Sequence, residues 1–167
     1  MEHIPEFDAL LTEQEAGAST LLLRYLHILS QYFTVNKDFS PAEKKAKLAW
    51  FYEKVTAAHP LMAIFPNGHQ FIRDRLDAGE SDIPTLLERF RSMTSRNIEK
   101  TVTAGADQLR NIHIVSTFSH SSIVRKFLLS AHQQNRRFTV NLTEARPVRE
   151  GVKLAKFLSR SDIPVAL

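Results

Sequence analysis

From about residue 111 to the end of the chain, the hydrophobic pattern alternates between one typical of strands and one typical of helices. Residues 112–118 form a short segment rich in β-branched side chains, and residues 163–167 begin another strand. Residues 137–142 alternate apolar with polar side chains. Residues 123–134 and 149–160 have helical spacing. Strand, helix, strand, helix, strand is the order of parallel βαβ units. The sequence therefore predicts an α/β fold that ends in a partial, three-strand Rossmann-like parallel sheet, with the first strand buried on both faces.

A parallel sheet of three strands leaves backbone groups unpaired along its edges. The strand pattern continues to Leu167, with nothing after it to cover the sheet. Two expectations stay open: another chain supplies the rest of the sheet, or this polypeptide is part of a longer product.

The residues before this region have helical spacing. A helical stripe covers residues 10–33, and Gly17 within it marks either a helix break or a close approach of backbone to another segment. Ser40 and Glu43 form a capping box, which predicts a helix over residues 41–58.

Further along, Pro66-Asn67-Gly68 predicts a turn that leads into a short helix. Asp82 is a suitable N-cap for a long helix over residues 83–104, and Gly105 is a suitable stop. We therefore predict two domains, a helical N-terminal domain over residues 1–110 and the first half of a Rossmann-like domain over residues 111–167.

Charge is distributed unevenly along the chain, whose net charge is +4. Residues 1–121 hold 13 Lys and Arg against 15 Asp and Glu, whereas residues 122–167 hold 9 against 3. This basic region is explained either by solvated helix faces or by binding to a phosphorylated small molecule or an acidic partner. It contains no nucleic-acid recognition motif, which argues against specific reading of DNA or RNA.

The chain has no apolar run long enough for a membrane span and no basic segment typical of a secretory signal at its start. We expect a cytoplasmic protein that does not bind membranes. There is no cysteine, which excludes disulfides and thiolate chemistry. The histidines lack metal-ligand spacing, so we predict neither a metal nor a cofactor.

The turn after the first predicted strand concentrates hydroxyl groups at the start of a helix. It contains Thr117, Ser119, His120, Ser121 and Ser122. Amide groups at a helix N-terminus bind anions, so one interpretation is a phosphate site. The other is simple helix capping by serine. His120 beside serines also resembles a nucleophile and base pair, but no third group is evident to orient it.

The turn after the second predicted strand holds Glu144 and Arg146. One interpretation is that Glu144 contacts a polyol and Arg146 a phosphate, for which the planar guanidinium is suited. The other is a local ion pair that orders the turn, with Pro147 at the start of the next helix.

The segments 114–128, 136–158 and 162–167 resemble the initiation factor 2B alpha/beta/delta family, which also contains methylthioribose-1-phosphate isomerase and ribose-1,5-bisphosphate isomerase. The resemblance lies in Thr-Glu-Ala-Arg-Pro at 143–147, Gly151 and Ile-Pro-Val at 163–165. Weaker, colinear similarity covers residues 17–29 and 60–72. The resemblance implies a helical N-terminal domain joined to a Rossmann-like domain, in a longer chain that forms dimers.

The resemblance also implies where isomerase chemistry would lie. The family's isomerases use a cysteine in the first turn and an aspartate in the later half of the chain. With Thr117 matched to the motif threonine, Ser119 stands at the cysteine position and Phe118 at a histidine position, and the aspartate would fall beyond Leu167. Aldose-ketose isomerisation moves a proton between adjacent sugar carbons, which needs an acid and a base on opposite sides of this carbon pair. This chain matches neither the family's cysteine nor its aspartate.

The resemblance places Gly17 and Ala18 with the ligand-binding residues, although Ala16 stands where the isomerases carry arginine. We therefore predict no catalytic residue. The predicted function is that of a non-catalytic regulatory or assembly protein similar to initiation factor 2B, or a fragment of one. It would form oligomers with itself or with related subunits and retain a pocket for a sugar phosphate or nucleotide phosphate.

Two alternatives remain. The first is an aldose-ketose isomerase of a ribose 1-phosphate derivative, completed by a longer chain. The second is an unrelated helical interaction module.

Overall fold

The computed structural model describes residues 3–118, 120–147 and 149–167, and it consists of two units. One unit ends at Thr94 and the other begins at Ser95. This division falls within one long helix. The domain boundary predicted at residue 110 marks a different feature, the change from helices to strands, and it stays a prediction about domain organisation.

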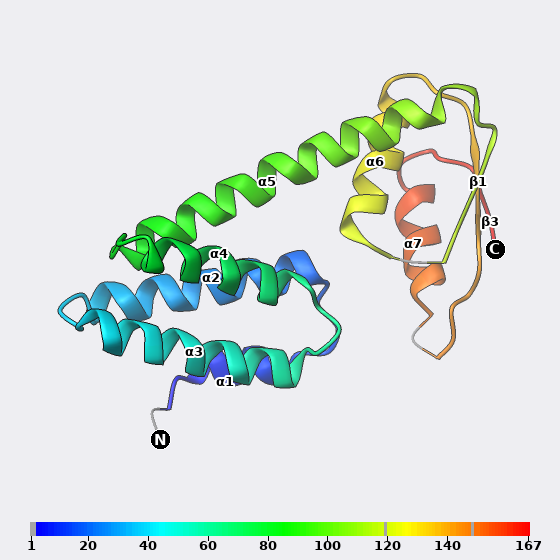
Figure 1. Ribbon diagram of the computed structural model, residues 1–167. Coiled ribbons are helices and arrows are strands. Elements are labelled where there is room, and N and C mark those ends of the chain that lie inside the picture. Colours follow the sequence, from blue (N-terminus) through cyan, green and yellow to red (C-terminus); the bar gives the residue numbers. More distant parts are fainter. Residues whose placement is uncertain (1–2, 119, 148) are drawn as a thin grey trace. The chain divides into compact units, whose positions relative to one another are not determined.

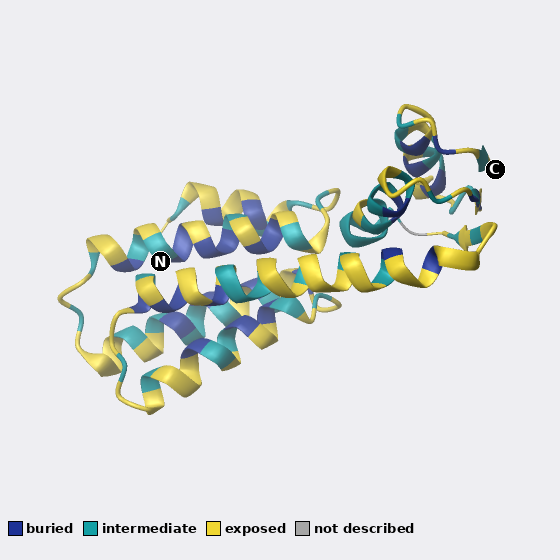
Figure 2. Ribbon diagram, turned by 90° about the horizontal axis from the view of Figure 1, so that it is seen from above, coloured by how far each residue is buried: buried dark blue, intermediate teal, exposed yellow. Residues whose placement is uncertain are grey.

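Helices are the regular secondary structure of the first unit in its described residues (Figure 1). Each helix buries an apolar face and exposes a polar one (Figure 2). The helix α1 packs on α2 and α3, and α4 also packs on α2 and α3. The elements are α1 (Pro5–Thr12), α2 (Ala18–Val35), α3 (Pro41–Ala58), α4 (Ile64–Asp77) and the first part of α5 (Ile83–Gln108).

Local signals predicted two helix starts correctly. Ser40 caps α3, because its hydroxyl accepts a hydrogen bond from the Glu43 amide at 3.3 Å and the Glu43 carboxylate accepts from the Ser40 amide at 2.8 Å. Asp82 precedes α5 and accepts hydrogen bonds from the amide and hydroxyl of Thr85. Gly17 is a helix break, since it is the N-cap of α2, and no other atom lies within 4 Å of where a Cβ would stand.

The predicted turn at Pro66-Asn67-Gly68 is wrong, because these residues lie inside α4. Pro66 is in the first helical turn, where a missing amide costs no hydrogen bond. Gly68 leaves room for the Phe90 ring, which would be 3.0 Å from a Cβ at this position. The glycine therefore permits close packing within a helix.

The second unit contains a parallel sheet with strand order β1-β2-β3. Its elements after α5 are the short 3₁₀ helix η1 (Leu109–Asn111), β1 (Ile114–Thr117), α6 (Ser122–Gln133), β2 (Thr139–Leu142), α7 (Glu150–Ser159) and β3 (Val165–Ala166). Figure 1 draws α6 and α7 on the same side of the strands, and the two helices contact each other. These observations confirm the predicted α/β class with a partial three-strand sheet.

The sequence predicts that the long helix ends at Gly105, and this prediction is wrong. The helix α5 continues to Gln108, and a Cβ at Gly105 would lie 3.2 Å from the Phe127 ring of α6. The small residue allows α6 to approach α5 closely, which a periodicity argument cannot distinguish from a helix end.

Only one face of the sheet is covered in the described residues. Val140 is fully buried, and its register partners Val115 and Val165 pack in the same core with α6 and α7. The side chains that alternate with these lie on the other side. We call them the open sheet face: Ile114, Ser116, Thr139, Asn141 and Ala166.

The open sheet face corrects the prediction that the first strand is buried on both faces. Ile114 is 62% exposed, and Phe118 just after β1 is 71% exposed. β-branched composition signals a strand, but it does not show whether a second layer of structure covers it.

Candidate functional site

The first candidate turn joins β1 to α6. Thr117 is the last residue of β1 and Ser122 is the first residue of α6. Ser121 is the N-cap of α6, and its hydroxyl accepts a hydrogen bond from the Ile123 amide at 3.3 Å. The serine cap is therefore present, although a cap leaves open whether the helix N-terminus also binds an anion. Ser119, the residue at the position of the family's cysteine, lies outside the described residues.

His120 connects the first turn to the second. Its backbone amide donates a hydrogen bond to the Glu150 carboxylate at 3.3 Å, and Glu150 is the first residue of α7. Burial lowers the pKa of the His120 imidazole, the charges of Arg125 and Lys153 lower that pKa further, and Glu150 acts in the opposite direction. Sequence reasoning missed Glu150, because an acidic residue at a helix start is ordinarily explained by the helix dipole.

The second candidate turn is held by ion pairs. The Arg146 Nε lies 2.5 Å from one oxygen of Glu144, and the Arg149 Nε lies 3.4 Å from the other. The predicted local ion pair is therefore present. Both arginines remain more than half exposed, so a ligand in solution has access to them.

Pro147 does not start the next helix, which begins at Glu150. Ala145 and Arg149 both have φ of 56°, a left-handed conformation that a right-handed helix cannot contain. The turn is therefore longer than predicted.

Gly151 explains why the start of α7 lies so close to the end of β2. A Cβ at this position would stand 1.7 Å from the Thr143 carbonyl oxygen, so only glycine fits without movement of the backbone. This contact fixes the second turn against α7.

The remaining predicted site residues, Gly17 and Ala18, lie at the start of α2 in the first unit. The residues of the two turns lie in the second unit, where the structure brings them together. Ligand binding by any of these residues stays a prediction.

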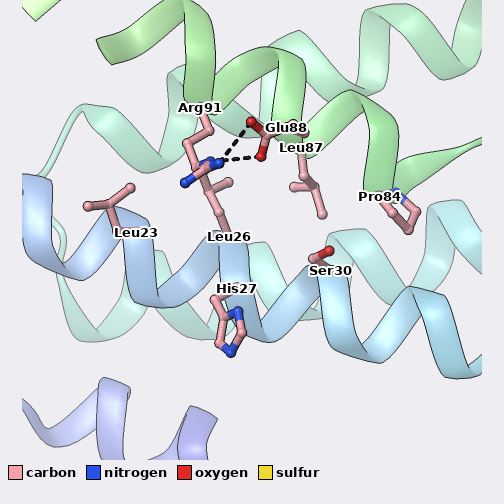
Figure 3. Close-up of a pocket in the computed structure, with 8 residues that line it drawn as sticks. All are labelled: Leu23, Leu26, His27, Ser30, Pro84, Leu87, Glu88 and Arg91. Carbon is pink, nitrogen blue, oxygen red and sulfur yellow. Dashed lines mark hydrogen bonds and ion pairs between the residues drawn. The ribbon is translucent and has the colours of Figure 1, made fainter.

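The first unit also contains a cavity of about 360 Å³ between α2 and α5 (Figure 3). The sequence analysis does not predict this cavity. Each of the two helices lines it with four residues whose positions differ by three, one and three, so that they lie on one face of the helix. Arg91 and Glu88 pair with each other through bonds of 2.7 and 2.9 Å, so their charges are largely satisfied. The lining residues are Leu23, Leu26, His27, Ser30, Pro84, Leu87, Glu88 and Arg91.

The described part of the chain lacks two further features. No described helix is long and apolar enough to cross a membrane. The described residues contain no group of three or more His, Cys, Asp or Glu side chains placed to hold a metal ion.

The chain consists of a helical unit followed by a parallel βαβαβ unit, with two turns at the carboxyl ends of β1 and β2. These features define the class of protein: a helical domain joined to a Rossmann-like α/β domain. A model of the Initiation factor 2 subunit family matches residues 14–167. The chain belongs to this family.

Known proteins are similar to this chain in sequence or in fold. An eIF-2B subunit 2-like translation initiation factor of Pyrococcus horikoshii is 34% identical over 113 residues, which is 66% of this chain and 40% of the relative. The crystal structure of the Pyrococcus horikoshii initiation factor eIF-2B has a TM-score of 0.76 at 24% identity, over 96% of this chain and 57% of that one.

A tetrameric eIF2B-beta2-delta2 complex from Chaetomium thermophilum contains a chain with a TM-score of 0.78 at 19% identity, over 98% of this chain and 59% of that one. At these identities the structural likeness shows the fold. The chain spans between 40% and 59% of the length of these relatives.

Proposed function

We propose that this chain is a non-catalytic assembly subunit, which works by associating with a second family subunit, either its own copy or a related chain. The open sheet face carries this proposal. Parallel sheets are almost always covered on both faces, and here one face is covered by α6 and α7 while the other is exposed. Family membership supports the proposal, since the C. thermophilum relative is a tetramer of two kinds of subunit.

The chemistry of the open sheet face fits a protein partner. Ile114 supplies exposed apolar surface, Ser116 and Asn141 supply hydrogen-bonding groups, and Phe118 adds an exposed aromatic ring beside β1. Apolar anchors with polar neighbours are typical of protein interfaces. The described residues of this face carry no charge that would need to lose its water on binding.

We expect Ile114→Glu to weaken self-association or association with the Pyrococcus horikoshii relative at least about tenfold, because it would bury a charge at the contact. Light scattering of the protein as it elutes from a size-exclusion column, across a concentration series, measures the degree of association. Val35→Glu is the matched control: Val35 is 82% exposed but lies in the first unit, and its variant should associate like the parent chain. A parent chain that stays monomeric alone and with the relative would contradict the proposal, as would equal association of the two variants.

We further propose that the two turns retain a phosphate site for a sugar phosphate or nucleotide phosphate, without isomerase activity. Basic side chains support this second function: Arg146 and Arg149 flank one acidic residue, while Arg125 and Lys153 affect the pKa of His120 at the start of α6. The absence of any cysteine supports a non-catalytic role, since a serine hydroxyl is far less acidic than a thiol. We place this function in the cytoplasm.

We expect titration calorimetry of the chain to show binding of ribose 5-phosphate or AMP, with no turnover of ribose 1-phosphate. Absence of heat with both compounds, in a sample shown to be folded by circular dichroism, would remove the phosphate site. Turnover that Ser119→Ala abolishes would instead establish the isomerase alternative.

A further inference from the structure

Arg125 lies where α6 and α7 meet. It belongs to the first turn of α6, and its guanidinium carbon stands 4.5 Å from the centre of the Phe157 ring of α7. Stacking on an aromatic ring restricts a guanidinium while leaving the N–H groups at its edge free to bind. The side chain is therefore oriented before any ligand arrives.

One donor of the Arg125 guanidinium, the buried Nε–H group, lacks a hydrogen-bond partner among the described residues. No ion pair joins Arg125 or Lys153 to an acidic side chain among the described residues. A buried donor in this state is satisfied by water or by a bound ligand. Since the donor belongs to a cation, an anion is the ligand it favours most.

Positive charge dominates around this position. Arg125 and Lys153 both act on the imidazole of His120, and together they exceed the single opposing carboxylate of Glu150. One oxygen of that carboxylate accepts the hydrogen bond from the His120 amide. The amide groups at the start of α6 add a further partial positive charge.

We propose that Arg125, held against Phe157 and assisted by Lys153, binds the phosphate group of the ligand. This inference rests on the phosphate site proposed above, and it adds the residue that binds the phosphate group directly. A guanidinium can contact two phosphate oxygens at once, which a lysine ammonium cannot do with the same geometry. The chemical class of the ligand is a phosphate monoester.

Titration of inorganic phosphate, ribose 5-phosphate and AMP into the chain tests the proposal. We expect Arg125→Met to weaken binding of every phosphate compound at least about tenfold, and Arg125→Lys to weaken it by a smaller factor because the charge remains. Lys126→Met is the matched control, since it removes one charge from the next position of α6. It should change affinity by less than about twofold.

The outcomes separate this inference from the proposals it depends on. Binding by the parent chain that Arg125→Met leaves unchanged would overturn the role of Arg125 alone, and water would then satisfy its Nε. Absence of binding by the parent chain would overturn both the role and the phosphate site. Phe157→Leu provides a second variant, expected to weaken binding without loss of charge, should melting curves show that Arg125→Met is not folded. Association through the open sheet face is measured separately.

Discussion

Gly151→Ala is expected to destabilise the second unit by at least about 3 kcal/mol, because the new methyl group would stand 1.7 Å from the Thr143 carbonyl oxygen. A flexible side chain can move aside, but a backbone carbonyl moves only with its strand. Either α7 shifts away from β2 or the second turn changes conformation. Both changes would separate Glu150 from the His120 amide and disrupt the candidate site.

Hydrogen exchange of backbone amides measures this effect, with loss of protection expected in β2 and α7. Two other glycines form a graded control series. At Gly105 a Cβ would meet the Phe127 side chain at 3.2 Å, so Gly105→Ala should cost an intermediate amount. At Gly17 a Cβ meets nothing within 4 Å, so Gly17→Ala should cost less than about 1 kcal/mol. Equal stability of all three variants would show that the close approach at Gly151 is absent.

These glycines also show which parts of the fold could be predicted from the sequence. The start of α3 was predictable because Ser40 and Glu43 bond to each other within one turn of chain. The sequence predicts a turn at Gly68 and a helix end at Gly105, but each glycine makes room for an aromatic ring from another helix. Local patterns identify local bonds, whereas packing between distant segments gives a glycine a different role.

The same distinction holds at the candidate site. The two turns could be predicted, because the alternation of strands and helices fixes where βα turns occur, and the structure places Thr117, Ser121, Glu144 and Arg146 there. The bond between His120 and Glu150 joins residues thirty positions apart, and the stack of Arg125 on Phe157 also crosses between helices. Neither contact leaves a pattern in a single sequence.

The first unit depends on a cluster of aromatic rings around Phe51. This side chain is fully buried, and its ring centre lies 4.8 Å from that of Phe7 and 5.0 Å from those of Tyr32 and Trp50, all with edge-to-face geometry. Phe51→Ala is therefore expected to cost about 3–5 kcal/mol, the sum of lost burial and an unfilled cavity. The rings of α1, α2 and α3 all meet at this residue, so the cavity cannot close by movement of a single helix.

Fluorescence of Trp50, the single tryptophan, reports unfolding of this unit in a denaturant titration. Leu61→Ala is the control, since Leu61 is 96% exposed and its loss should change stability by less than about 0.5 kcal/mol. A fall in the midpoint at unchanged slope would identify lost stability of the native unit, whereas a changed slope would identify altered compactness of the unfolded state. A midpoint for Phe51→Ala equal to that of Leu61→Ala would contradict a core centred on Phe51, because no buried ring of this size can be removed from a packed core at so small a cost.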